Sequence, residues 1–223
     1  MDIPILYEDN HLLAVEKPVN IPVQADQTGD LDLLSILKED IKVRYQKPGN
    51  VYLGLVHRLD RPVGGVMVLA KTSKAASRLS EVIRRQAFNK KYLAVVRGTP
   101  KEKQAKLEHT LWKDRQKNQV YVVPADHPQG KKAVLEYKVV GEEKDMSLLQ
   151  IRLHTGRPHQ IRVQLSHIGC PLHGDQKYGQ KINKPGQQIA LWAAELQFEH
   201  PTKKDWIKVT QAPPKTFPWK LFE

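Results

Sequence analysis

The chain has one cysteine and no long apolar run. The single Cys170 excludes an internal disulfide and any zinc site built from several cysteines. No stretch reaches the roughly 18 apolar residues of a membrane-spanning helix, and the opening MDIPILYEDN lacks the basic segment and apolar core of a secretory signal. We therefore expect no membrane association, a reducing cytoplasmic location and a packing role for Cys170.

Several catalytic signatures are also missing. The chain has no Gly-x-x-x-x-Gly-Lys-Ser/Thr loop, no Gly-x-Gly-x-x-Gly after a strand and no Gly-x-Ser-x-Gly turn. Nucleotide hydrolysis, dinucleotide redox chemistry and serine hydrolysis thus lose their usual signatures. The histidine-rich stretch near residues 154–173 suggests a metal site, but it has few carboxylates and no His-Glu-x-x-His spacing. We expect neither a metal nor a cofactor; the possible ligands would be His154, His159, His167 and His173.

Negative charge is scarce overall and unevenly distributed. The formal net charge is +12 and the isoelectric point is about 9.7. The charged residues within 1–40 are mainly acidic, whereas those within 84–117 are mainly basic. Such asymmetry favours a polyanionic partner, although a solvated lysine-rich surface would explain the same composition.

The pattern of apolar residues predicts an α+β protein. Strand-like runs dominate, beginning with a hairpin around residues 8–10 and continuing through alternating runs between residues 106 and 155. Helical spacing predicts helices near 33–41, capped by Asp30 or Asp32, over 73–86 and over 157–168. The last would have Pro158 in its first turn and Gly169 after its end. We expect one domain with a large mixed or antiparallel sheet flanked by helices.

Two polar clusters stand out against this frame. His57-Arg58-Leu59-Asp60 precedes a buried strand, so that a lone acid lies in a basic loop. The second cluster contains Arg162 next to Ile161, at the border of an apolar helix stripe. A guanidinium there needs an anionic partner, and Asp60 is a candidate. A purely structural ion pair between loop and helix explains the spacing equally well.

These clusters, in this order, resemble the RluA family of RNA pseudouridine synthases. HRLDRPVGGVMVLAKT matches the family's first signature, GRPHQIR matches a later one, and KKYLAVVRG lies between them. The opening ILYEDNHLLAVEKPVNIPVQ and the later HGDQKYG and ALWAAELQFEHP also fit, so the resemblance runs from about Ile5 to Pro201. The chain departs from the family at Val63-Gly64-Gly65, usually Thr-Ser-Gly, and at Gln164, commonly His.

The resemblance implies the family's fold, with a central RNA-binding cleft, and its reaction, in which a uridine base is detached, turned and rejoined through carbon 5. Asp60 would be the essential carboxylate, acting either by covalent attack or through a glycal, and Arg162 would pair with it. Tyr92 would stack on the base and help to remove the carbon-5 proton. Arg58 would enter the space left by the flipped base. The remaining substrate contacts would come from His57, Arg157, His159 and Gln160.

The expected partner is a stem-loop of ribosomal or transfer RNA, bound by a monomer without a nucleotide cofactor. Because the resemblance starts near Ile5, we expect residues 1–223 to form a single catalytic domain without a separate N-terminal RNA-binding module. Affinity would then come chiefly from the basic segment Arg84–Lys117. An RNA-binding protein without chemistry and a metal-dependent nuclease are the alternatives.

Overall fold

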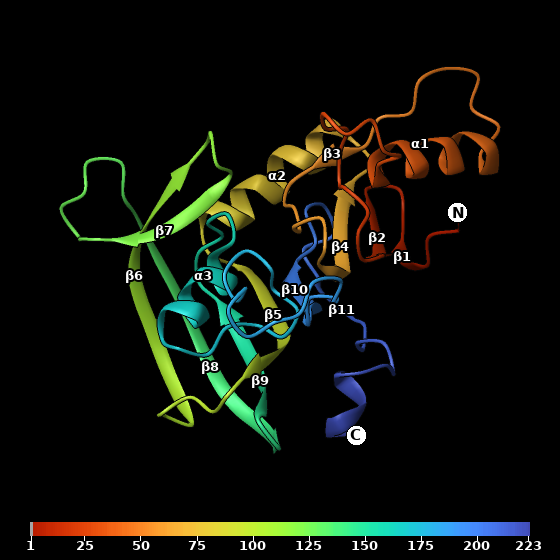
Figure 1. Cartoon of the computed structure of the whole chain (residues 1–223). Coiled ribbons are helices and arrows are strands. Elements are labelled where there is room, and N and C mark those ends of the chain that lie inside the picture. The colour runs from red at the N-terminus through yellow and green to blue at the C-terminus, as the bar shows by residue number, and fades with distance from the viewer. Residues whose placement is uncertain (1) are drawn as a thin grey trace. The chain divides into compact units, whose positions relative to one another are not determined.

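A computed structural model describes residues 2–223, which form two compact units. Unit 1 runs to Asn89 and includes Ala193–Ala212, and unit 2 contains Lys90–Trp192 and Pro213–Glu223. The chain passes from one unit to the other within β5, within β10 (both labelled in Figure 1) and again between Ala212 and Pro213. The prediction of a single domain concerns the whole chain and stays a prediction.

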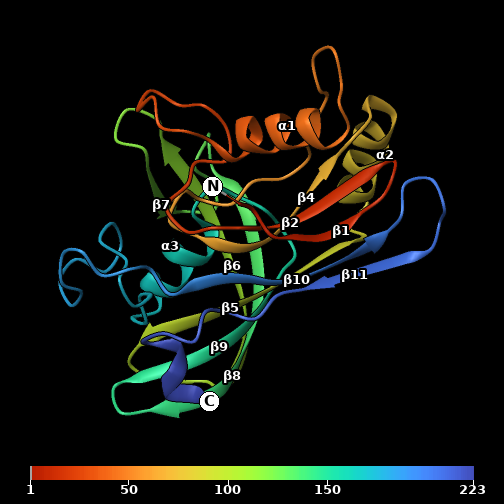
Figure 2. The same cartoon turned by 90° about the vertical axis from the view of Figure 1, so that its right-hand side faces the viewer.

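Unit 1 is built on a sheet in which β2 and β4 are central. Its strand order is β1-β2-β4-β10, with β3 beside β4 and β11 beside β10. The predicted hairpin near residues 8–10 is confirmed, because β1 and β2 pair antiparallel and the Asp9 carboxylate accepts the backbone N–H groups of His11 and Leu12. Figure 2 shows β10 and β11 as a second hairpin. The strands are β1 (Ile5–Glu8), β2 (Leu12–Lys17), β3 (Gly54–Leu55), β4 (Gly64–Ala70), β10 (Leu191–Glu199) and β11 (Trp206–Thr210).

Two capped helices belong to unit 1, namely α1 (Leu33–Arg44) and α2 (Ser73–Arg84). Asp32, one of the two predicted caps, accepts the N–H of Ser35 at 3.0 Å, which satisfies a donor of the first turn. Thr72 caps α2 in the same way. The apolar face of α2 packs in one buried cluster with β4. The helices predicted from apolar spacing near 33–41 and over 73–86 are therefore both present.

Unit 2 is built on an antiparallel sheet of long strands. Its order is β5-β9-β8-β6-β7, and every neighbouring pair is antiparallel. The alternating runs predicted between residues 106 and 155 are therefore strands, and the α+β class with a large sheet is confirmed. The strands are β5 (Phe88–Arg97), β6 (Gln104–Asp114), β7 (Gln119–Val123), β8 (Lys131–Glu143) and β9 (Met146–Leu153); a short 3-10 helix, η1, spans Trp219–Phe222.

The third helix, α3 (Gln160–His167), begins three residues later than predicted. His159 adopts a left-handed conformation with φ of 50°, and the Gln160 side chain accepts the N–H of Arg157 at 3.0 Å. The preceding turn is therefore folded back instead of continuing the helix. Gly169, with φ of 81°, follows the end of α3 as expected for a C-terminal glycine.

Helix α3 is buried on nearly every side from Gln160 to Leu165. Its Val163 packs in an apolar cluster with Leu111 of β6, Val120 of β7 and Ala133 of β8. Arg162 is itself only 7% exposed, so its guanidinium is buried more deeply than a position at the border of an apolar stripe requires. No helix within residues 2–223 is both long and apolar enough to cross a membrane.

Candidate functional site

The His57–Asp60 cluster lies in the loop that joins β3 to β4 in unit 1. His57 is buried, and its Nε2 accepts the backbone N–H of Val68 in β4 at 3.0 Å. Its ring also packs against Phe88, with 5.4 Å between the ring centroids. His57 thus fastens the loop to the sheet, while its predicted substrate contact stays a prediction.

The same loop presents two charged groups at the surface of unit 1. Leu59 is buried, whereas Arg58 is exposed and Asp60 is half-buried. The carbonyl of Asp60 accepts the N–H of Val63 at 3.0 Å, which closes a turn directly after the acid. Burial of Leu59 on one side and this turn on the other therefore fix the backbone that carries Asp60.

A buried lysine, which the sequence reasoning did not identify, supports that turn. Lys17 ends β2 with no exposed surface. Its Nζ donates to the carbonyl oxygens of Pro18, Arg61 and Val63 at 2.9, 3.0 and 2.8 Å. Burial lowers the pKa of Lys17 to about 7, the charge of Asp60 opposes this shift, and that of Arg61 adds to it. The visible signal was a lysine at the end of an apolar strand before a proline.

The loop meets β4 at a glycine that lies very close to the neighbouring strand β10. Gly65 has φ of 116°, and a Cβ atom there would lie 2.3 Å from the carbonyl oxygen of Ala193 in β10. Only glycine fits this backbone conformation and this close approach. Of the three residues Val63-Gly64-Gly65, the glycine that follows the family pattern is thus required by packing.

Arg61, the cation directly after Asp60, is directed towards the loop near residues 20–30. Its guanidinium forms an ion pair with the Asp30 carboxylate and donates to the Asn20 carbonyl and the Thr28 hydroxyl, each at 3.2 Å. Asp30 thus pairs with Arg61, while Asp32, directly before Leu33, caps α1. The guanidinium of Arg61 therefore has its partners in the loop of unit 1 near residues 20–30.

In unit 2, Arg162 forms a bidentate ion pair with Asp175. Its Nε donates to Oδ2 at 2.8 Å and a terminal nitrogen donates to Oδ1 at 2.9 Å. Burial alone would raise the pKa of Asp175, but the hydrogen bonds and charge of Arg162 lower it below the ordinary value. The anionic partner required by Arg162 is thus present, and it lies in the segment HGDQKYG, to which the sequence reasoning gave no role. Pairing of Arg162 with Asp60 stays a prediction.

The other members of the second cluster connect α3 to β8. Gln160 accepts from the Thr155 hydroxyl at 2.8 Å and donates to the Val134 carbonyl at 3.1 Å. Arg157 donates from Nε to the Lys132 carbonyl at 2.9 Å. These groups therefore organise the start of α3, and their contacts with substrate stay predictions, as do those of His159.

Tyr92 and Gln164 both lie in buried positions of unit 2. Tyr92 faces Ile151 across the β5–β9 pair and is 6% exposed; its predicted stacking on a base is not tested by this position. Gln164 is fully buried, and its Nε2 lies 2.9 Å from Nδ1 of His109. Gln164, where the chain departs from the family pattern, thus connects α3 to β6.

The basic segment of the sequence reaches into the turn between β6 and β7; residues 113–118, which are the end of β6 and this turn, are here named the hairpin tip. Lys113, Arg115 and Lys117 are exposed there. The single acid of the tip, Asp114, accepts the N–H groups of Gln116 and Lys117 at 2.9 and 3.1 Å. The tip therefore presents mainly positive charge to solvent.

The four histidines considered as metal ligands have separate surroundings. His154 pairs with Glu136, His159 with Tyr178, His167 packs on His109, and His173 packs on Phe217. Among residues 2–223 no three His, Cys, Asp or Glu side chains are grouped as a metal site. Cys170 is buried, and burial raises the pKa of its thiol, as fits the predicted packing role.

The described residues include an acid in a braced basic loop, a buried arginine–aspartate pair and an exposed basic tip. These features suit an enzyme that acts on a nucleic acid. Residues 11–167 match the model of the RNA pseudouridylate synthase family. The chain belongs to this family.

Curated relatives resemble the chain over most of its length. It is 33% identical to ribosomal large subunit pseudouridine synthase C of Buchnera aphidicola, covering 92% of this chain and 65% of the relative. It is 35% identical to ribosomal large subunit pseudouridine synthase D of Zymomonas mobilis, covering 90% and 66%, and 32% identical to an uncharacterized RNA pseudouridine synthase of Bacillus subtilis, covering 93% and 68%. The chain thus spans about two thirds of the length of these relatives.

Solved structures show the same fold. The human protein RNA pseudouridylate synthase domain containing 4 aligns with a TM-score of 0.78 at 24% identity, over 95% of this chain and 89% of that chain. Human RNA pseudouridylate synthase domain containing 1 aligns with a TM-score of 0.77 at 23% identity, over 96% and 85%. The predicted pseudouridine synthase fold is therefore confirmed.

Proposed function

We propose that this protein converts uridines of structured RNA into pseudouridine, with Asp60 as the essential carboxylate. The observation that carries the proposal is the HRLD loop, in which Lys17 and His57 brace the backbone around a half-exposed acid. Relatives named for the large ribosomal subunit make ribosomal RNA the first substrate to test, and transfer RNA the second. The protein would act in the cytoplasm as a monomer.

The reaction would exchange one glycosidic bond for another. The bond from N1 of uracil to C1′ breaks, the base turns, and a bond from C5 to C1′ forms. C5 loses a proton and N1 gains one, so no electrons enter or leave. Asp60 would act either as a nucleophile or as the base that forms a glycal. Tyr92 would stack on the base and assist removal of the C5 proton, and Arg162 would pair with the carboxylate and orient it.

The target base must leave the RNA stack before it can react, at a cost of a few kcal/mol. Arg58 is exposed beside Asp60 in the loop and has a planar, cationic guanidinium. Such a group can stack on neighbouring bases and bind a phosphate. Arg58 would therefore occupy the space that the flipped base leaves.

RNA affinity would come from exposed cations of the basic segment, above all at the hairpin tip. Lys and Arg side chains that neutralise phosphates release counterions, so binding weakens steeply with salt. The tip supplies three such exposed side chains in unit 2, Lys113 at the end of β6 and Arg115 and Lys117 in the turn.

The experiment is to incubate a large-subunit ribosomal RNA transcript with the protein and to map pseudouridines by carbodiimide labelling and primer extension. We expect new labelled uridines, RNA of unchanged length, and activity that survives EDTA on a small stem-loop. RNA that binds without any labelled uridine would favour a binding protein without chemistry. Shortened RNA that chelation protects would favour a nuclease.

A further inference from the structure

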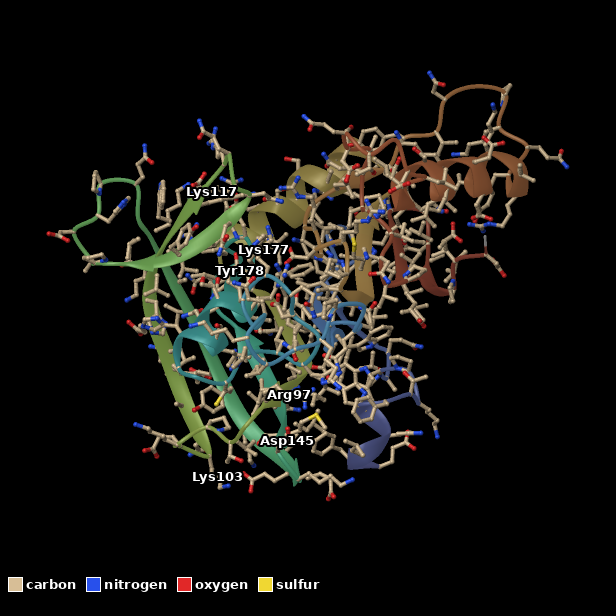
Figure 3. All side chains as sticks on the ribbon, in the orientation of Figure 1. Arg97, Lys103, Lys117, Asp145, Lys177 and Tyr178 are labelled. Atoms are coloured by element: carbon tan, nitrogen blue, oxygen red, sulfur yellow. The ribbon has the colours of Figure 1, made fainter. Side chains whose placement is uncertain are left out.

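The segment Asp175–Tyr178 contacts both α3 and the hairpin tip within unit 2. It begins after Gly174, where φ is 76° and a Cβ atom would lie 2.2 Å from the Gln188 carbonyl oxygen. Figure 3 shows Lys177 and Tyr178 near the end of the hairpin that carries Lys117, whereas Lys103 lies at the other end of β6. The segment is therefore placed between a helix and a turn.

One side of the segment holds Arg162. Asp175 binds its guanidinium in a bidentate pair, and the Tyr178 ring lies under it, with 5.3 Å from the guanidinium carbon to the ring centroid. Oδ1 of Asp175 also accepts the N–H groups of Lys177 and Tyr178 at 2.9 and 3.2 Å. The same carboxylate thus orders both the arginine and the turn that carries the tyrosine.

The other side of the segment holds the hairpin tip. Nζ of Lys177 donates to the Asn118 carbonyl at 2.9 Å. The Tyr178 hydroxyl accepts the N–H of Val120 at 2.8 Å and shares a hydrogen bond of 2.7 Å with Nδ1 of His159. Val120 lies in β7, two residues beyond the tip, so the tyrosine under Arg162 is bonded to the strand that leaves the tip, while Lys177 is bonded to the tip itself.

We propose that Asp175 and Tyr178 are positioning residues that couple RNA phosphate bound at the hairpin tip to the orientation of Arg162. The proposal rests on the proposed function, in which Arg162 acts beside the catalytic acid. Phosphate contacts at Arg115 and Lys117 fix the tip, and the fixed tip, through Val120 and Asn118, holds Tyr178 in place. Bound RNA thereby favours one orientation of the guanidinium over others.

The first test uses Tyr178→Phe, which removes the hydroxyl and keeps the ring. At saturating RNA we expect roughly tenfold slower pseudouridine formation with a KM that changes little, because the loss is one of positioning. A tip variant, Arg115→Gln with Lys117→Gln, should both weaken binding and slow the saturated rate. The combined variant should be no slower at saturation than Tyr178→Phe alone, whereas independent, multiplying losses would overturn the coupling.

Matched controls separate positioning from general loss of structure. Tyr137→Phe removes a hydroxyl that donates to the Glu102 carbonyl just before β6, and it should leave the saturated rate unchanged. Asp175→Asn keeps an oxygen for the turn but loses the bidentate pair, with an expected loss of about 100-fold in rate. Asp145→Asn removes a carboxylate of the exposed pair with Arg97 and should change little. Equal losses in the test and control variants would overturn the proposal.

A readout independent of turnover is the Nε–H signal of Arg162 in nitrogen-15 NMR spectra, identified by its loss in Arg162→Lys. A uridine-containing stem-loop should shift this signal in the wild type, and less in the tip variant or Tyr178→Phe. An active wild type without the shift overturns the coupling alone. A shifted signal in a protein that makes no pseudouridine overturns the proposed function and keeps the coupling. Failure of the stem-loop to bind contradicts both.

Discussion

The ammonium group of buried Lys17 donates to the carbonyl oxygen of Arg61 at 3.0 Å, and Arg61 directly follows Asp60. A second donation reaches Val63 at 2.8 Å, so one side chain of β2 holds both ends of the segment that follows the acid. The three carbonyl partners satisfy an ammonium group that would otherwise be costly to bury. It places the acid on a backbone that is fixed before RNA binds.

The first prediction concerns stability and pH at Lys17. Its folded-state pKa of about 7 lies below the usual value near 10.5. Between these values the unfolded chain binds more protons, so stability rises with pH. From pH 7 to pH 9 the wild type should gain roughly 2 kcal/mol more than Lys17→Met, measured by urea unfolding at both pH values.

The exposed Lys42 of α1 provides the control for this measurement. Lys42→Met should show the same dependence of stability on pH as the wild type. If Lys17→Met also kept the wild-type dependence, the buried ammonium would have no unusual titration and the first prediction would be wrong.

The second prediction concerns the backbone at Gly65. A Cβ atom would meet the Ala193 carbonyl at 2.3 Å, so Gly65→Ala should cost more than about 3 kcal/mol of unfolding free energy. Gly29 also has a positive φ, of 72°, but nothing lies within 4 Å of its Cβ position. Gly29→Ala should therefore cost only about 1 kcal/mol. Similar losses in urea unfolding would show that the close approach to β10 is unimportant.

The third prediction separates base flipping from bond chemistry at Arg58. Arg58→Ala should slow turnover strongly on a stem-loop with a stacked target uridine and less on one whose target is already unstacked. The reason is that an unstacked base needs less free energy to enter the site. Single-turnover rates on the two RNAs give the comparison, and an equal loss on both would assign Arg58 a structural role.

The fourth prediction locates the RNA-binding surface within the basic segment. Neutralising Lys113 and Lys117 at the hairpin tip should lower the slope of log affinity against log salt by about one for each lysine. Lys103 and Lys106 are exposed but already paired with Glu142 and Glu108. Neutralising these two should change the slope less. A larger effect at the paired lysines would place the RNA elsewhere on the basic segment.

Local patterns predicted the elements of this fold, but long-range contacts decided the details of the site. The apolar spacing identified α2, which Thr72 caps in the structure, because a helix is set largely by neighbouring residues. The predicted start of α3 was wrong because the Gln160 side chain binds the Arg157 N–H and folds back the turn before the helix. The same side chain is also held by the distant Val134 carbonyl. Lys17 was missed for a similar reason, since two of its three partner carbonyls lie 44 and 46 residues further along the chain.

The central claim is that Asp60 is the essential carboxylate, and Asp60→Asn tests it most directly. The amide keeps the shape of the side chain but is neither a competent nucleophile nor a base at neutral pH. The variant should bind the ribosomal RNA transcript as well as the wild type or better, because a repulsion of order 1 kcal/mol with phosphate is removed.

The deciding measurement is carbodiimide mapping of pseudouridine after incubation with well-folded Asp60→Asn protein prepared without wild-type contamination. Asp26→Asn, at an exposed position of the same unit, serves as the control and should retain wild-type turnover. We expect no pseudouridine with Asp60→Asn while RNA binding persists. Measurable pseudouridine from that variant would contradict the central claim.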